Sequence, residues 1–563
     1  MRGNRIRKKG LGLLFTIGIL CAMAGCGRGD KELAAGASQE GDIKQDSSTS
    51  QELQADTGED EGVPGWKLDA QDKVSFDWYI NFSWYTTPWG ENAVSKAIEE
   101  ETGVHINFIS PQGNEAEKFN ALISSDTLPD LITLGWWENQ VDEMISRDMV
   151  YSLNGLADQY DMYFWKVVDP TVCSWYEKED GNLYCYPNSC YTPEDYEKNN
   201  NISSNQTFLV RKDIYEAIGS PDMTTTEGFQ QAVEDATTAF PEVDGYPLIP
   251  VGAHVFSETG CNSFDKYLQN FLAIPYEVDG KAYDRFSDPE YRRWLGMFRE
   301  LGAAGYLKED IFIDQRTQME EKIARGQYFC MLYQRTDMEA QQKVLYANNP
   351  DSIYIAVDGP KNSNGADPVL PGTGINGWTI TLISKNCERP DRAIEFLSYL
   401  ISEHGQQMVY LGVEGLTYDM VNGKPLTRPE VKELLNTDRN SYDQLYGADD
   451  AYWMLQDNVM QLQWSEGLEP PMGQLEEWTY PYSHYLGQYE VDYDINSEAG
   501  NIARKVEKLW SQVLPKLLLA STQEEFDALY DQYLEEAYAE GYDIVLEENT
   551  RQYQQAKDKL GMQ

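Results

Sequence analysis

Two loops of this chain carry tryptophan side chains that could bind the apolar face of a ligand. Both loops directly follow predicted strands, the first and the third of the chain. Indole rings stack on the C–H faces of sugars, while neighbouring polar groups hydrogen-bond the hydroxyls. The competing interpretation is that each ring covers an edge of the core, because Trp is usually mostly buried. The candidates are Trp84, Trp89, Trp136, Trp137 and, as a charged partner, Glu138.

The segments around these loops alternate between strand and helix patterns. β-branched and aromatic runs predict strands over 74–80, 104–109 and 128–134, and apolar residues at helical spacing predict helices over 91–102 and 116–124. This alternation favours a parallel sheet covered by helices. Ligands of such sheets bind beyond the carboxyl ends of the strands, which is where the aromatic loops lie.

The first 26 residues read as an export signal. A basic cluster precedes an apolar run over 11–23, which is too short to span a membrane and ends at Ala24-Gly25-Cys26. The pattern resembles a bacterial lipoprotein signal, with 1–25 removed and Cys26 lipidated. An ordinary signal with a chance cysteine is the alternative. Residues 26–65 are acidic and rich in Ser and Gly, which predicts a disordered tether. We therefore expect a body anchored by lipid to the extracellular face of the cell membrane.

Charge and motifs exclude several classes of function. The formal net charge of −48 disfavours nucleic acid and anionic lipid as partners. There is no GxSxG, GxxxxGK[ST] or HExxH motif. With 93 acidic residues, a pair of carboxylates suited to glycoside hydrolysis could occur almost anywhere, so such a pair does not indicate an enzyme. No CxxC pair and no D-x-[DN]-x-[DN]-G loop occurs, so no catalytic residue, metal or cofactor is assigned, although calcium stays open for so acidic a chain.

Six cysteines lie in the body of the chain. An exported protein can form disulfides, and Cys185 with Cys190 is the closest pair. A body of about 500 residues does not need such cross-links, so free buried thiols are the equal alternative. The six are Cys173, Cys185, Cys190, Cys261, Cys330 and Cys387.

An ordered set of segments resembles the extracellular solute-binding proteins (family 1) of bacterial ABC transporters, in particular their oligosaccharide-binding type and lipoprotein subgroup. No single segment is diagnostic, whereas their order along 66–556 is fairly specific. The segments are ALISSDTLPDLITL (121–134), LNGLADQYD (153–161), DGNLYCYPNS (180–189), FLVRKDIYEAIGSPDMTTTEGF (208–229), EEKIARGQYFCMLY (320–333), the run from GWTITLISKN to GLTYDM (377–420) and the run from EEFDALYDQY to TRQYQQA (524–556).

The resemblance implies an α/β, two-lobed periplasmic-binding-protein-like fold (type II). Its lobes are joined by a hinge, and the ligand is enclosed in the interlobe cleft by closure. We expect lobe one to comprise 66–205 plus 372–412, and lobe two to comprise 206–371 plus 413–563 with the C-terminal helices.

The resemblance also implies a function and adds site residues. It implies a monomeric, non-enzymatic receptor that binds an oligosaccharide and delivers it to the permease of an importer. Trp378 is carried over from the resemblance, and Arg335 and Asp337 follow the segment CMLY, where a strand of the second lobe should end. A receptor for peptides or another solute, and a surface-anchored glycan-active enzyme, are the alternatives, because a fold does not fix its ligand.

Overall fold

The computed structural model describes residues 63–468, 470–494 and 497–562. The predicted signal, most of the predicted tether and the lipidation site Cys26 lie outside these residues. Within them, no helix combines the length and the apolar character needed to cross a membrane.

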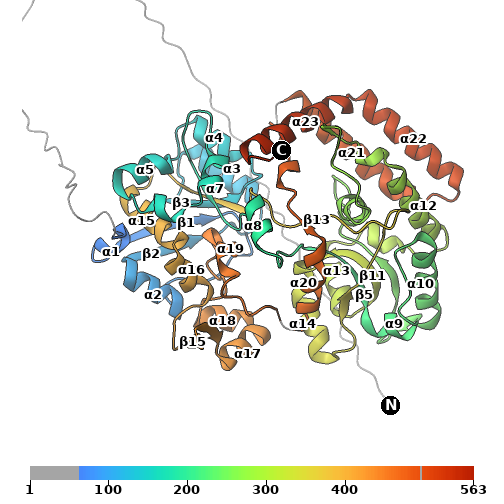
Figure 1. Ribbon diagram of the computed structural model, residues 1–563, viewed down its shortest axis with the longest axis horizontal. Helices are drawn as coiled ribbons and strands as arrows, with labels where there is room; N and C mark the ends of the chain where they lie inside the picture. Colours follow the sequence, from blue (N-terminus) through green and yellow to red (C-terminus); the bar gives the residue numbers. More distant parts are fainter. Residues whose placement is uncertain (1–62, 469, 495–496, 563) are drawn as a thin grey trace, which may run out of the picture. The chain divides into compact units, whose positions relative to one another are not determined.

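The first sheet contains the three strands predicted near the N-terminus. Its order is β2-β1-β3-β14-β4, and β1 pairs in parallel with both β2 and β3 (Figure 1). β14 runs antiparallel to β3 and β4, so the sheet is mixed and not purely parallel. The strands are β1 Val74–Ile80, β2 Val104–Ile109, β3 Leu131–Gly135, β4 Tyr186–Pro187 and β14 Thr379–Ile383.

Both faces of this sheet are buried. Trp78 and Ile80 of β1 enter one core, while Tyr79 between them enters the other, as the alternation of a strand requires. The predicted helices are observed as α2 Ala93–Thr102 and α3 Glu115–Ser125. Further helices of this part are α1 Gly65–Leu68, α4 Gln140–Ser146, α5 Leu153–Tyr160, α6 Phe164–Val167, α7 Pro170–Tyr176, α8 Pro193–Lys198, α15 Pro390–Ile401 and α16 Glu403–Tyr410.

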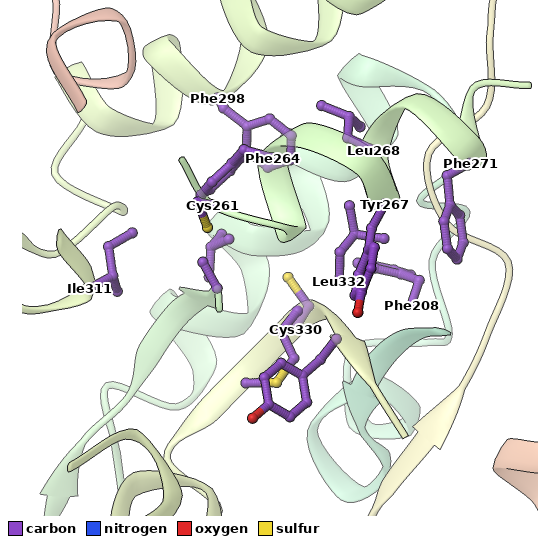
Figure 2. Close-up of a cluster of buried hydrophobic side chains, with 14 of the residues drawn as sticks. Phe208, Cys261, Phe264, Tyr267, Leu268, Phe271, Phe298, Ile311, Cys330 and Leu332 are labelled. Carbon is purple, nitrogen blue, oxygen red and sulfur yellow. The ribbon is translucent and has the colours of Figure 1, made fainter. Parts of the chain in front are cut away.

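The second sheet has the order β12-β5-β11-β8. β11 is antiparallel to β5 and parallel to β8, and its side chains pack in a separate core. Figure 2 shows part of this core, with side chains from β5, from β11 and from the segment 261–271. The strands are β5 Gln206–Arg211, β8 Ile249–Gly252, β11 Tyr328–Gln334 and β12 Tyr354–Ala356, and the helices are α9 Lys212–Ala217, α10 Thr226–Ala239, α11 Leu268–Phe271, α12 Pro289–Ala303, α13 Arg316–Ala324, α14 Glu339–Asn348 and α20 Gly473–Thr479.

Three C-terminal helices join the second core. They are α21 Glu498–Leu518, α22 Gln523–Ala539 and α23 Tyr542–Lys559. Trp510 of α21 is 1% exposed and donates a hydrogen bond from its indole nitrogen to Asp265. The last helices therefore pack with the core of the second sheet.

The segment after residue 412 differs from the prediction. We expected it to accompany the second lobe, yet Val431, Tyr442 and Tyr452 belong to the same buried cluster as Trp78 of the first sheet. Contacts with the loop after β1 hold the segment there, because the Tyr452 hydroxyl donates a hydrogen bond to the carbonyl oxygen of Pro88 at 2.6 Å. This segment contains β15 Tyr418–Val421, β16 Lys424–Thr427, α17 Pro429–Thr437, α18 Arg439–Leu445 and α19 Asn458–Gln461.

Candidate functional site

Three indole rings meet at the edge of the first sheet where β1 and β3 end and β14 begins. We call Trp84, Trp378 and Trp453 the tryptophan cluster. The rings of Trp84 and Trp378 are parallel, with an interplanar angle of 5° and centroids 6.1 Å apart. Trp453 lies beneath them, 4.5 Å from Trp378 between ring centroids. Trp84 is 58% exposed and Trp453 is 6% exposed, so one ring faces solvent while another anchors the cluster in the core.

Asn188, at the end of β4, holds this cluster in place. Its side-chain oxygen accepts a hydrogen bond from the Thr379 N–H at 2.7 Å, and its amide nitrogen donates to the Trp453 carbonyl at 2.9 Å. Gly377, two residues before Thr379, has φ +65°, and a Cβ there would lie 2.0 Å from the Asn188 carbonyl oxygen. Glycine is therefore required for the chain to turn into β14 beside Trp378.

A second group of side chains follows β3 at the same edge. Glu138 accepts a hydrogen bond from the Gly135 N–H at 3.0 Å and another from the Asn81 side chain at 2.7 Å. The carboxylate thus joins the ends of β1 and β3. Loss of surrounding water raises the pKa of Glu138, against the two hydrogen bonds that lower it. Trp137 is 50% exposed, and its ring lies edge-on to that of Trp136, with centroids 6.2 Å apart.

Trp136, Trp137 and Glu138 line a cavity of about 370 Å³. Its volume falls in the range of roughly 300–1,000 Å³ that is usual for small-molecule sites. One wall is formed by the loop after β3 and by α7, and the other by residues 490–492 and α23. The lining includes Trp136, Trp137, Glu138, Trp175, Asn376, Glu490, Asp492, Arg551, Gln552 and Lys559.

A hydrogen-bonded chain connects the two walls. The Trp175 indole donates to the side-chain oxygen of Asn376 at 2.7 Å, and the Asn376 amide nitrogen donates to Glu490 at 2.7 Å. Glu490 is accessible from the cavity, but the protein around it displaces water and raises its pKa to about 7, while Asn376 and Lys266 act in the opposite direction. Carboxylate and amide oxygens are thus presented beside aromatic rings, which suits a ligand rich in hydroxyl groups.

The structure places five of the eight residues proposed from the sequence in two groups near the same sheet edge. Trp84 and Trp378 form the tryptophan cluster with Trp453. The other three, Trp136, Trp137 and Glu138, line the cavity.

Three proposed residues lie elsewhere. Trp89 is 8% exposed and packs in the core, edge-on to Tyr452 with ring centroids 5.0 Å apart, because the loop turns its side chain inward. Arg335 is 7% exposed and donates to the Ser204 carbonyl at 2.9 Å. Asp337 lies 3.3 Å from Arg316. None of the three lines the cavity.

Sequence reasoning missed several members of the site. Trp453 lies far along the chain from the two aromatic loops, and its aromatic character is its only local signal. No local pattern distinguishes the other lining residues from ordinary surface residues. These are Trp175, Asn376, Glu490 and the α23 side chains. They join the site because distant segments pack together.

Thiols and metal ligands can also be placed. All six cysteines among the described residues are free thiols, including Cys185 and Cys190. In the same part of the chain, no group of three or more His, Cys, Asp or Glu side chains is arranged to hold a metal ion.

Comparison with known families gives one match over most of the body. The model of the bacterial extracellular solute-binding protein family matches residues 93–418, more than half of the chain. Among curated proteins, the chain is 22% identical over 407 residues to the polygalacturonan/rhamnogalacturonan-binding protein YtcQ of Bacillus subtilis, covering 70% of this chain and 77% of that protein. It is 24% identical over 237 residues to the fructooligosaccharide ABC transporter substrate-binding protein FusA of Streptococcus pneumoniae, covering 39% of this chain and 42% of that protein.

Solved structures agree with the fold. The structure of S. pneumoniae FusA in complex with kestose superposes with a TM-score of 0.65 at 17% identity, covering 86% of this chain and 100% of that chain. A human-milk-oligosaccharide (HMO) binding, ABC-transporter-associated protein of Bifidobacterium longum infantis gives 0.62 at 13% identity, covering 87% and 100%. The alginate-binding protein AlgQ2 gives 0.60 at 19% identity, covering 86% and 99%. The predicted periplasmic-binding-protein-like α/β fold is therefore confirmed.

Proposed function

The chain belongs to the bacterial extracellular solute-binding proteins, and from this premise we propose that it is the lipid-anchored receptor of an ABC importer for an oligosaccharide. The solute lies against the tryptophan cluster and in the adjoining cavity. The two lobes close on it, and the receptor delivers it to the permease. This family is one of solute-binding proteins and not of enzymes, in agreement with the prediction.

The observation that carries the proposal is the exposed face of Trp84. Its ring is 58% exposed although it stacks in parallel on Trp378, so the structure holds a rigid aromatic surface toward solvent. A sugar ring stacks on such a surface through its C–H groups. Glu138, Asn376 and Glu490 add hydrogen-bonding groups in the neighbouring cavity.

The printed names of similar proteins support the class of solute. YtcQ is a polygalacturonan/rhamnogalacturonan-binding protein, and FusA is the substrate-binding protein of a fructooligosaccharide transporter. Both names describe carbohydrate polymers or oligomers.

Ligand screening by thermal unfolding tests the proposal. Purified protein is heated with a panel of oligosaccharides and, in parallel, of peptides. A ligand at 100 times its dissociation constant stabilises the folded state by about 2.7 kcal/mol. Stabilisation by oligosaccharides is the expected result. Stabilisation by peptides alone would identify a receptor of the same fold for another solute, and release of products from a glycan would identify an enzyme.

A further inference from the structure

The charges around the cavity are predominantly negative. Among the residues that line it, carboxylates outnumber cations by five to three. The carboxylates are Glu138, Asp142, Glu177, Glu490 and Asp492. The cations are Lys178, Arg551 and Lys559.

Each of these three cations already has a partner. Lys178 pairs with Asp142 at 2.9 Å. The guanidinium of Arg551 donates to both carboxylate oxygens of Glu548, at 2.8 and 2.5 Å. This bidentate pair uses two of the five guanidinium N–H donors and offsets the charge of Arg551.

The third cation is also occupied. The ammonium group of Lys559 donates to the Trp175 carbonyl oxygen at 3.1 Å and lies 5.6 Å from the centre of the Trp175 ring. Burial and the neighbouring Lys178 lower the pKa of Lys559. A carboxylate on a ligand would therefore have to break an existing contact to gain a cationic partner.

Apart from Asp142, the carboxylates that line the cavity form no ion pair with these three cations. Burial raises the pKa of Glu138 and brings that of Glu490 to about 7, so Glu490 carries its full negative charge only above that pH. A second anion brought beside them would add repulsion where little water screens it. A sugar hydroxyl would instead donate to their oxygens, since a carboxylate oxygen that accepts one hydrogen bond can accept another.

We propose that this cavity selects uncharged oligosaccharides and discriminates against those that carry uronate groups. The inference rests on the proposed function and narrows its ligand class. It separates this chain from YtcQ, whose printed name describes a ligand built of galacturonate. In this proposal the ligand preference follows from the sign of the charge that lines the cavity, and a shared fold does not determine that charge.

A matched pair of ligands tests the proposal by isothermal titration calorimetry. The uncharged panel includes fructo-, manno-, xylo- and galacto-oligosaccharides and fully methyl-esterified trigalacturonate, and the charged panel contains the free acid of trigalacturonate and other uronate oligomers. We expect the tightest ligand to be uncharged. We also expect the methyl ester to bind at least about tenfold more tightly than the free acid, a difference of about 1.4 kcal/mol.

Asp492→Asn supplies a second readout, because it removes one negative charge from the cavity wall. It should reduce the ratio of the dissociation constants of the free acid and the methyl ester. Glu234→Gln, a change at an exposed residue of α10 outside the cavity, should leave this ratio unchanged. Preferred binding of a uronate oligomer would overturn the selectivity and leave the receptor function standing. Failure of every carbohydrate to bind would overturn both.

Discussion

Replacing Trp84 with alanine should weaken oligosaccharide binding while leaving the fold intact. Trp84 is the most exposed ring of the tryptophan cluster, whereas Trp453 is 6% exposed and anchors it. Removal of Trp84 therefore takes away a surface for the ligand and leaves its support in place. Truncation of Trp453, in contrast, would cost stability as a buried large-to-small change does, about 3–5 kcal/mol.

The size of the effect follows from the exposed area. Trp84 is 58% exposed, so about two-fifths of its surface is already covered by the protein. A Trp side chain has about 200 Å² to bury, which leaves about 120 Å² for a ligand, and a sugar on one face covers about half of that. At about 25 cal/mol per Å², the lost contact is worth about 1.5 kcal/mol, or about tenfold in the dissociation constant. The same arithmetic limits the cost to folding to about 2 kcal/mol.

Titration calorimetry with the best oligosaccharide from the panel measures the change, and thermal unfolding confirms that the variant is folded. Trp165→Ala is the matched control. Trp165 is 39% exposed, its indole donates to Asp158 at 2.8 Å, and it belongs neither to the cluster nor to the cavity. A folded Trp84→Ala protein that binds within about twofold of the unchanged protein would refute the assignment of this ring to the site.

Three further outcomes are expected. Gly377→Ala should lower the free energy of unfolding by roughly 1–3 kcal/mol more than Gly113→Ala, as measured by chemical denaturation. Both glycines have positive φ, but only at Gly377 would the new Cβ collide with backbone, the carbonyl oxygen of Asn188. Equal losses in the two variants would contradict the steric argument. Burial raises the pKa of Asp265 to about 7, so its contribution to stability is full below its unfolded pKa and is lost as pH rises through about 7. Asp265→Asn should therefore flatten the fall in stability between about pH 4 and 7, and an unchanged slope would count against it. Cys26→Ala should abolish lipid labelling and membrane retention; normal labelling would disprove lipidation at this residue.

Local sequence predicted the first strands and helices, but not which tryptophans of the adjoining loops are exposed. The strands predicted over 74–80 and 104–109 match β1 and β2 at both ends, because strand alternation is a local property. Trp84 and Trp89 occupy the same loop, yet one is exposed and the other packs against Tyr452. Which way each ring points depends on a segment hundreds of residues later in the chain. No periodicity within the loop could have distinguished them.

The tryptophan cluster combines an exposed binding surface with a rigid foundation. An exposed indole on a mobile loop would lose conformational entropy when a ligand ordered it, and that loss would reduce affinity. Here Trp84 is held by its contacts with Trp378 and Trp453, and Asn188 fixes both the Trp453 backbone and the start of β14. The stability of the sheet edge and the geometry of the site therefore depend on the same hydrogen bonds. Changes at Asn188 should impair folding and binding together, whereas changes at Trp84 should separate them.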